Sequence, residues 1–280
     1  MGMGWVEAMK GNGDRYRSSS LLPALRPGPA SRYIHPKAMG LVHADSEHDL
    51  NLDVTDENAP NYLRWIADEI SGYLGKRVLE VGAGTGSITA RYADGREVLA
   101  TDRSAWCAEE MRHRFATSPN VTVRCADLDA VVNESERFDS VVMINVLEHI
   151  ADDVDALKAV ATLLEPDGRI IIYVPALNGL YGPWDRRVGH YRRYAPWRMR
   201  AILRESALVD VEMHYMNALS LPAWWVRSRT SVERDLAGGL SLWDKTGVRV
   251  SRGLESIVRV PVGLNLFCVA QPLLERSGRQ

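Results

Sequence analysis

The chain has 280 residues, with 34 lysines and arginines against 36 aspartates and glutamates and a formal net charge of −2. This length is enough for one substantial core with a cap or a second subdomain, and the even charge balance argues against a nucleic-acid-binding protein. Three widely spaced cysteines argue against a disulfide framework and a zinc site. We find no apolar run long enough to span a bilayer and no signal-peptide core, so we expect a cytoplasmic protein.

The N-terminal segment 1–56 is rich in Gly, Ser, Pro and Arg and ends in a polar stretch that contains Tyr33, His35 and His43. Two interpretations stay open for this segment: a disordered tail, or a lid that folds over a binding site. We expect the folded domain to span 57–271, with a C-terminal tail over 272–280.

Strands and helices are expected to alternate from residue 76 onward, after a first helix. Apolar residues at helical spacing predict a first helix over 61–74. Strands are expected over 77–81, 97–101, 121–125, 138–144 and 169–174, and helices over 87–93, 105–117, 152–164 and 197–206. The strands are almost continuously apolar, which is typical of a sheet covered on both faces. The pattern therefore predicts a doubly wound, mostly parallel α/β sheet.

The regular alternation stops after residue 174. A turn at 165–168 is expected to lead into the fifth strand, and a Pro-, Gly- and Tyr-rich loop is expected over 175–195. A long insertion, 217–262, separates two late strands over 209–215 and 264–270. Insertions near the carboxyl ends of parallel strands usually surround the substrate, so we expect this one to form a cap.

A glycine-rich turn directly follows the first predicted strand, with Gly82, Gly84 and Gly86 at alternate positions. Glycine has no Cβ, so the backbone of such a turn can approach a ligand closely. A dinucleotide fingerprint, G-x-G-x-x-G, would need its third glycine where Ser87 stands.

The sequence E-x-G-x-G-x-G at 80–86 resembles motif I of the class I S-adenosylmethionine-dependent methyltransferases. Asp102 ends the second strand, twenty residues after Gly82, where a carboxylate can accept hydrogen bonds from ribose hydroxyls. Its alternative role is to cap the next helix. The run 138–150 resembles motif IV and the segment after it. The resemblance covers about 76–175 and implies a seven-stranded, Rossmann-like sheet.

This resemblance implies S-adenosylmethionine as cofactor, S-adenosylhomocysteine as product and no metal. It places cofactor binding at the ends of the first four strands, in Glu80, Gly82, Ala83, Gly84, Gly86, Asp102, Arg103, Asp127, Leu128, Asn145 and Val146. Asp127 would contact the adenine amino group, with a simple turn as its alternative. Glu148 and His149 are interpreted as the start of a helix rather than as an acid–base pair.

The segment 180–194 resembles L-Y-G-x-x-D-x-x-x-G-H-x-R-R-Y, found in a bacterial branch of the family whose members include enzymes of natural products or glycans. His190 in this loop is the first candidate for the catalytic base, because imidazole exchanges protons near neutral pH. Tyr194 and Tyr33 are the next candidates. The alternative is that His190, Asp185 and Arg193 form a structural network.

The leading hypothesis is methyl transfer to a small molecule, such as a bacterial natural product, on nitrogen, oxygen or an aromatic carbon. A NAD-dependent oxidoreductase and a non-catalytic scaffold are the alternatives. Residues 185–204 contain seven arginines against one aspartate, which fits either an anionic substrate or a solvated basic face. No nucleic-acid partner is expected, and a homodimer stays open.

Overall fold

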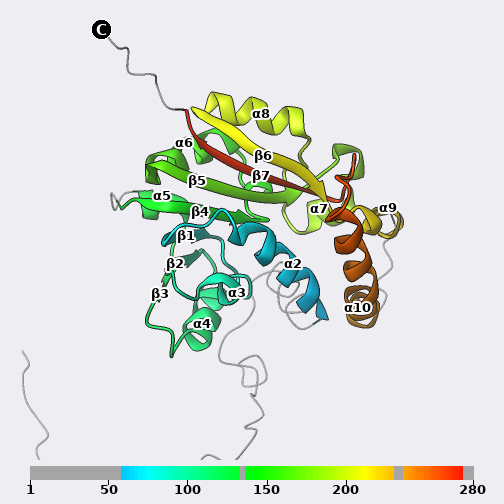
Figure 1. Cartoon of the computed structure of the whole chain (residues 1–280), viewed down its shortest axis with the longest axis horizontal. Helices are drawn as coiled ribbons and strands as arrows, with labels where there is room; N and C mark the ends of the chain where they lie inside the picture. The colour runs from blue at the N-terminus through cyan, green and yellow to red at the C-terminus, as the bar shows by residue number, and fades with distance from the viewer. Residues whose placement is uncertain (1–57, 133–135, 230–235, 274–280) are drawn as a thin grey trace, which may run out of the picture. The chain divides into compact units, whose positions relative to one another are not determined.

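The computed structural model describes residues 58–132, 136–229 and 236–273. Tyr33, the predicted lid and nearly all of the predicted C-terminal tail lie outside these residues. The described chain forms one seven-stranded sheet in the order β3-β2-β1-β4-β5-β7-β6, in which β7 alone is antiparallel (Figure 1). The strands are β1 (Arg77–Val81), β2 (Glu97–Asp102), β3 (Val121–Cys125), β4 (Phe138–Ile144), β5 (Leu164–Pro175), β6 (Leu208–Met216) and β7 (Asn265–Pro272).

Helices connect the strands and cover both faces of the sheet. They are α2 (Pro60–Ser71), α3 (Thr89–Tyr92), α4 (Ala105–Arg114), α5 (Leu128–Val132), α6 (Asp153–Leu163), α7 (Pro183–Arg187), α8 (Pro196–Glu205), α9 (Leu221–Arg229) and α10 (Leu236–Glu255). Short 3-10 turns follow some strands: η2 (Leu147–His149), η3 (Asn178–Leu180) and η4 (Ala218–Ser220). The predicted mostly parallel α/β sheet is confirmed.

The sheet separates two hydrophobic layers, and strand β4 contributes to both. Val141 and Met143 pack on the side of α6 and α8, whereas Val142 and Ile144 pack on the side of α2, α3 and α4. Successive side chains of a strand point to opposite faces, so a strand buried on both faces must be apolar at every position. This explains the continuous apolar runs in the sequence.

Two predicted boundaries need correction. The predicted turn at 165–168 lies inside β5, which begins at Leu164 and pairs with β4 from Phe138 through a register shift. Regular pairing resumes at Arg169, where the fifth strand was predicted to start. The predicted loop over 175–195 contains a turn of helix, α7, because Pro183 stands at its first position and Asp185 accepts the N–H of Gly182 before it.

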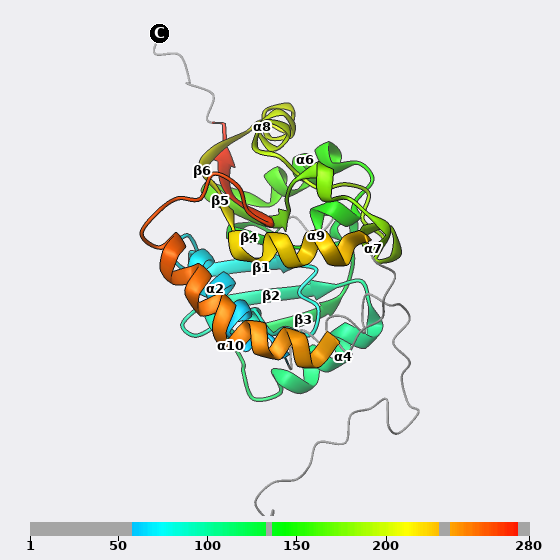
Figure 2. The ribbon, with the colours of Figure 1, turned by 90° about the vertical axis from the view of Figure 1, so that its right-hand side faces the viewer.

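The insertion contributes two helices at one edge of the sheet. Figures 1 and 2 show α7, α9 and α10 near the edge where the parallel strands end. Helix α10 packs against α2, and the carboxylate of its buried Asp244 accepts the backbone N–H groups of Asn61 (3.0 Å) and Tyr62 (2.8 Å). This carboxylate therefore caps α2 from a distant part of the chain. No helix in the described part of the chain is long and apolar enough to cross a membrane.

Glu80 is a buried carboxyl in the middle of this core. It accepts hydrogen bonds from the hydroxyls of Thr89 and Tyr92, both at 2.5 Å, and so ties β1 to α3. Burial raises the pKa of Glu80 to about 7, although both hydrogen bonds oppose the shift. The folded protein therefore holds a proton on this group at pH values where the unfolded chain has released it.

We expect Glu80→Gln to flatten the pH dependence of stability between about pH 4.5 and 7. A raised carboxyl pKa contributes stability below the unfolded pKa, and this contribution is lost as the pH rises through the folded pKa. Relative to the variant, the wild-type free energy of unfolding should fall by up to about 3 kcal/mol between pH 4.5 and 8. Urea unfolding at a series of pH values measures this; parallel curves for the two proteins would contradict it.

Candidate functional site

The glycine turn lies at the carboxyl end of β1 and adopts a backbone conformation that favours glycine. Gly82, Gly84 and Gly86 have φ angles of 67°, 58° and 77°. A Cβ on Gly82 would come within 2.5 Å of the Cγ2 atom of Val146. The turn therefore excludes other side chains both by its dihedral angles and by the packing of the segment that follows β4.

Asp102 links this turn to the end of β2. One carboxylate oxygen accepts the N–H of Gly84 at 2.9 Å, and the other accepts the N–H of Ser104 at 2.8 Å. Helix α4 is capped by the hydroxyl of Ser104, which accepts the N–H of Cys107 at 3.3 Å. Asp102 is thus not the helix cap, and its half-buried carboxylate is held beside the glycine turn.

The other predicted cofactor residues lie on the same edge of the sheet, except Glu80. Asp127 is exposed before α5 and accepts the N–H of Ala130 at 2.9 Å, which is the turn role considered as its alternative. Asn145 is exposed after β4 with a left-handed φ of 53°. The remaining positions are strand ends or their neighbours: Ala83, Arg103, Leu128 and Val146. The carboxyl of Glu80 faces α3 instead, so its observed contacts are structural.

A buried carboxylate organises the segment after β5. One oxygen of Asp185 accepts the N–H of Gly182, and the other lies 2.9 Å from both His190 Nδ1 and Arg193 Nε. Burial alone would raise the pKa of Asp185, but the hydrogen bond with His190 and the Arg193 guanidinium hold it below its usual value. The structural network weighed from the sequence is therefore present.

The same network positions His190 against η2. Its Nε2 atom lies 3.9 Å from a carboxylate oxygen of Glu148, and its ring meets the His149 ring edge-on, with centroids 4.6 Å apart. Glu148 is fully buried, and neither of its carboxylate oxygens has a hydrogen-bond partner among the described residues. Burial raises the pKa of Glu148 to about 8.

Sequence reasoning missed this Glu148–His149–His190 cluster, because it interpreted Glu148 and His149 only as a helix start. Their ligand atoms all lie within 4.8 Å of one another. A signal was present: Glu148 and His149 follow β4, and His190 follows β5, the neighbouring parallel strand. Side chains that follow adjacent parallel strands meet at one edge of a sheet.

Tyr194 occupies a position that does not suit a catalytic base. Its side chain is fully buried, and its hydroxyl lies 3.2 Å from both the Leu147 carbonyl and a carboxylate oxygen of Asp153. Burial and the nearby Asp153 raise the pKa of this phenol far above its usual value. Tyr194 therefore ties the segment after β5 to η2 and α6.

Most of the arginine-rich segment is occupied by structural ion pairs. Arg192 and Arg198 pair with Asp153, Arg193 with Asp185, and Arg200 with Asp210. Arg193 also stacks over the ring of Trp224 in α9 at 5.1 Å, which joins the insertion to the Asp185 network. Because these arginines already pair with carboxylates of the protein, the contacts favour a structural role for the segment over a binding site for an anionic substrate.

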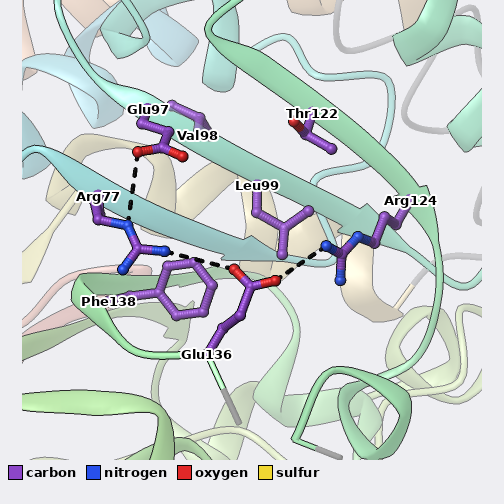
Figure 3. A pocket seen from close by; sticks show the side chains of 8 residues that line it. All are labelled: Arg77, Glu97, Val98, Leu99, Thr122, Arg124, Glu136 and Phe138. Carbon is purple, nitrogen blue, oxygen red and sulfur yellow. Dashed lines mark hydrogen bonds and ion pairs between the residues drawn. The ribbon is translucent and has the colours of Figure 1, made fainter. Parts of the chain in front are cut away.

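A cavity of about 210 Å³ lies along β1, β2 and β3, from the starts of β1 and β2 at Arg77 and Glu97 to Arg124 in β3 (Figure 3). Its charged residues neutralise one another: Arg77 pairs with Glu97 and Glu136, and Arg124 also pairs with Glu136. This cavity does not share residues with the glycine turn or with the Glu148–His149–His190 cluster.

Known proteins resemble the central part of this chain. Residues 78–168 match the family model described as a methyltransferase domain. A ubiquinone biosynthesis O-methyltransferase of Alkalilimnicola ehrlichii is 32% identical over 127 residues, which are 44% of this chain and 48% of that protein. The chain thus matches about half the length of this curated relative.

Solved structures share the fold over a longer range at low identity. The 1,6-didemethyltoxoflavin N1-methyltransferase of Burkholderia thailandensis, solved with S-adenosylhomocysteine, has a TM-score of 0.51 and 21% identity and covers 80% of this chain and 83% of its own. The [4+2]-cyclase SpnF has a TM-score of 0.52 and 15% identity and covers 76% and 82%. Residues 78–168 thus match a methyltransferase domain, and the sheet built around them shares its fold with these solved structures.

Proposed function

We propose that this protein transfers a methyl group from S-adenosylmethionine to a small-molecule acceptor. The proposal depends on one observation: the glycine turn and Asp102 share an edge of the sheet with the Glu148–His149–His190 cluster. Strand β1 carries the turn and pairs with β4, which leads to the cluster. The strand order reverses between β1 and β4, and ligands of doubly wound sheets bind at such a reversal.

The chain offers a cradle that fits the cofactor. Gly82 and Gly84 provide close backbone approach, and the partly exposed carboxylate of Asp102 can accept hydrogen bonds from ribose hydroxyls. Asp127 and Asn145 are exposed on either side, at the ends of β3 and β4. When bound, S-adenosylmethionine supplies a methyl group on a positively charged sulfur.

On the acceptor side, the Asp185 network gives His190 a fixed orientation. Its Nδ1 faces Asp185, and its Nε2 faces Glu148. Fixed alignment of an acceptor with the methyl group can supply about 7–11 kcal/mol of a reaction barrier. We assign His190 the role of removing a proton from the acceptor or positioning it, and Tyr33 stays a prediction for the same role.

The insertion supports an acceptor of small size. Its helices α9 and α10 lie, with α7, near the edge that carries the site (Figure 2). The ubiquinone and toxoflavin enzymes to which the chain is similar are named for small molecules. We propose a natural product or related metabolite, methylated on nitrogen, oxygen or an aromatic carbon. The three cysteines are free thiols, which supports a reducing, cytoplasmic location.

The second candidate function is a cyclisation reaction. It is suggested by the similarity in fold to a [4+2]-cyclase, because one fold can support different reactions. Incubating the protein with methyl-labelled S-adenosylmethionine and small-molecule extracts, followed by mass spectrometry, separates the two. A labelled product supports methyl transfer. Cofactor binding with a changed but unlabelled product would support the alternative.

We expect Asp102→Ala to weaken S-adenosylhomocysteine binding by about 2–4 kcal/mol, because charge-assisted hydrogen bonds to the ligand are lost. The N–H groups of Gly84 and Ser104 also lose their acceptor. Isothermal titration calorimetry measures the change. Asp129→Ala, at an exposed position in the first turn of α5, is the matched control and should bind normally. Equal affinity of both variants would place the cofactor elsewhere.

We expect His190→Ala to lower kcat by about 10²–10⁴-fold with S-adenosylhomocysteine affinity preserved, because the loss of a positioned acid–base group has this size of effect. Transfer of label to the product gives the rate. His113→Ala removes an exposed histidine of α4 that also faces a carboxylate, Glu109, and should leave the rate unchanged. A normal rate with a lowered melting temperature in His190→Ala would show that His190 is structural only.

A further inference from the structure

We propose that Glu148, His149 and His190 form a binding site for a divalent transition-metal cation. The inference rests on the proposed function, because it assigns this cation to the acceptor side of the same site. Of the two roles considered for His190, it selects positioning of the acceptor, since a nitrogen that binds a cation cannot also remove a proton. It departs from the sequence-based expectation that no metal is involved. The three side chains come from the segments that follow β4 and β5, and their ligand atoms lie within 4.8 Å of one another.

The burial of Glu148 points to a missing ligand. Its side chain has no exposed surface, yet neither oxygen accepts a hydrogen bond from any described residue. Buried carboxylates in proteins are normally hydrogen-bonded, paired or bound to a metal. The Nε2 atom of His190 lies 3.9 Å from one of these oxygens, which is too long for a hydrogen bond. A cation between the two side chains would satisfy both.

The contacts of His190 match those of a metal-bound histidine. Its Nδ1 lies 2.9 Å from Asp185, so a proton on Nδ1 leaves Nε2 with a lone pair directed toward Glu148. Metal-binding histidines commonly donate their other ring N–H to a carboxylate in this way. Asp185 is in turn fixed by Arg193 and by the N–H of Gly182, so the histidine is oriented before any ligand binds.

The donor set indicates the class of cation and its use. Two imidazoles and one carboxylate suit zinc and related first-row divalent ions, and three protein ligands leave a position open. An oxygen of the acceptor can take the open position. A hydroxyl bound there loses its proton to water more readily, while the electron pair of the O–H bond stays on the oxygen and the cation keeps its oxidation state. The site thus favours an oxygen acceptor over a neutral amine or an aromatic carbon.

Cobalt(II) is a suitable probe, because its visible absorption reports imidazole and carboxylate ligation. We expect the full-length, cofactor-free protein to bind one equivalent of Co²⁺ and to release it to Zn²⁺. Glu148→Gln, which keeps the shape of the side chain, and His190→Asn should each weaken binding by at least about 100-fold, more than the 10–100-fold typical of an outer contact. Asp185 orients His190 without being one of the three ligands, so Asp185→Asn should lose about 10–100-fold.

The matched control is His214→Asn. His214 also lies near two carboxylates, Glu69 at 3.1 Å and Glu212 at 3.3 Å, but on strand β6, away from the cluster. Its Co²⁺ affinity should equal that of the wild type. The proposal is overturned if the wild type binds no stoichiometric Co²⁺, if His214→Asn abolishes binding, or if the cluster variants bind normally. Should Glu148→Gln fail to fold by circular dichroism, His149→Asn and His190→Asn decide the question.

Calorimetry with S-adenosylhomocysteine on the same proteins separates this proposal from the proposed function. Retained S-adenosylhomocysteine binding without any Co²⁺ binding removes the metal site and leaves the methyltransferase proposal standing. Stoichiometric Co²⁺ binding by a protein that binds no S-adenosylhomocysteine would support the metal site and contradict the methyltransferase proposal. Addition of a chelator should lower the labelled-product yield of the wild type only if both proposals hold.

Discussion

The candidate site depends on the buried carboxylate of Asp185. A charge without exposed surface is stable only if hydrogen bonds and an opposite charge replace its water, and this carboxylate has Gly182, His190 and Arg193 around it. Because these partners span the segment after β5, one interaction fixes both the start of α7 and the orientation of His190. Removing it would leave the Arg193 guanidinium buried without its carboxylate, so the acceptor side of the site would lose its order before the sheet did.

The sheet topology explains why the glycine turn and the Glu148–His149–His190 cluster lie at one edge. The parallel strands β1, β2, β4 and β5 all end at one edge, and the chain reverses its direction of strand addition between β1 and β4. The glycine turn and Asp102 stand at the ends of β1 and β2, which are linked by the hydrogen bond between Asp102 and Gly84. The cluster uses the ends of β4 and β5. The strands of the core therefore place two separate sets of polar groups at the same edge of the sheet.

The insertion is attached to the domain through polar as well as apolar contacts. Asp244 in α10 caps the first turn of α2, and Trp224 in α9 lies against the Arg193 guanidinium. Trp243 adds a hydrogen bond to the hydroxyl of Ser220 at 3.0 Å. Trp224 and Trp243 thus help to hold the insertion in place.

The sequence by itself determined the elements whose pattern lies within a few consecutive residues. Continuous apolar runs predicted the sheet, and the glycine spacing predicted the turn after β1, because strand burial and glycine conformations are decided within a few residues. Only the tertiary structure decided the roles of Glu148, Tyr194 and Glu80. Each is a polar residue whose role depends on burial or on partners distant along the chain. Glu148 follows β4 and faces His190, which follows the neighbouring strand β5. Tyr194 bonds to Asp153, and Glu80 points into the core toward Tyr92. Such pairings arise from strand order and packing, which no local pattern encodes.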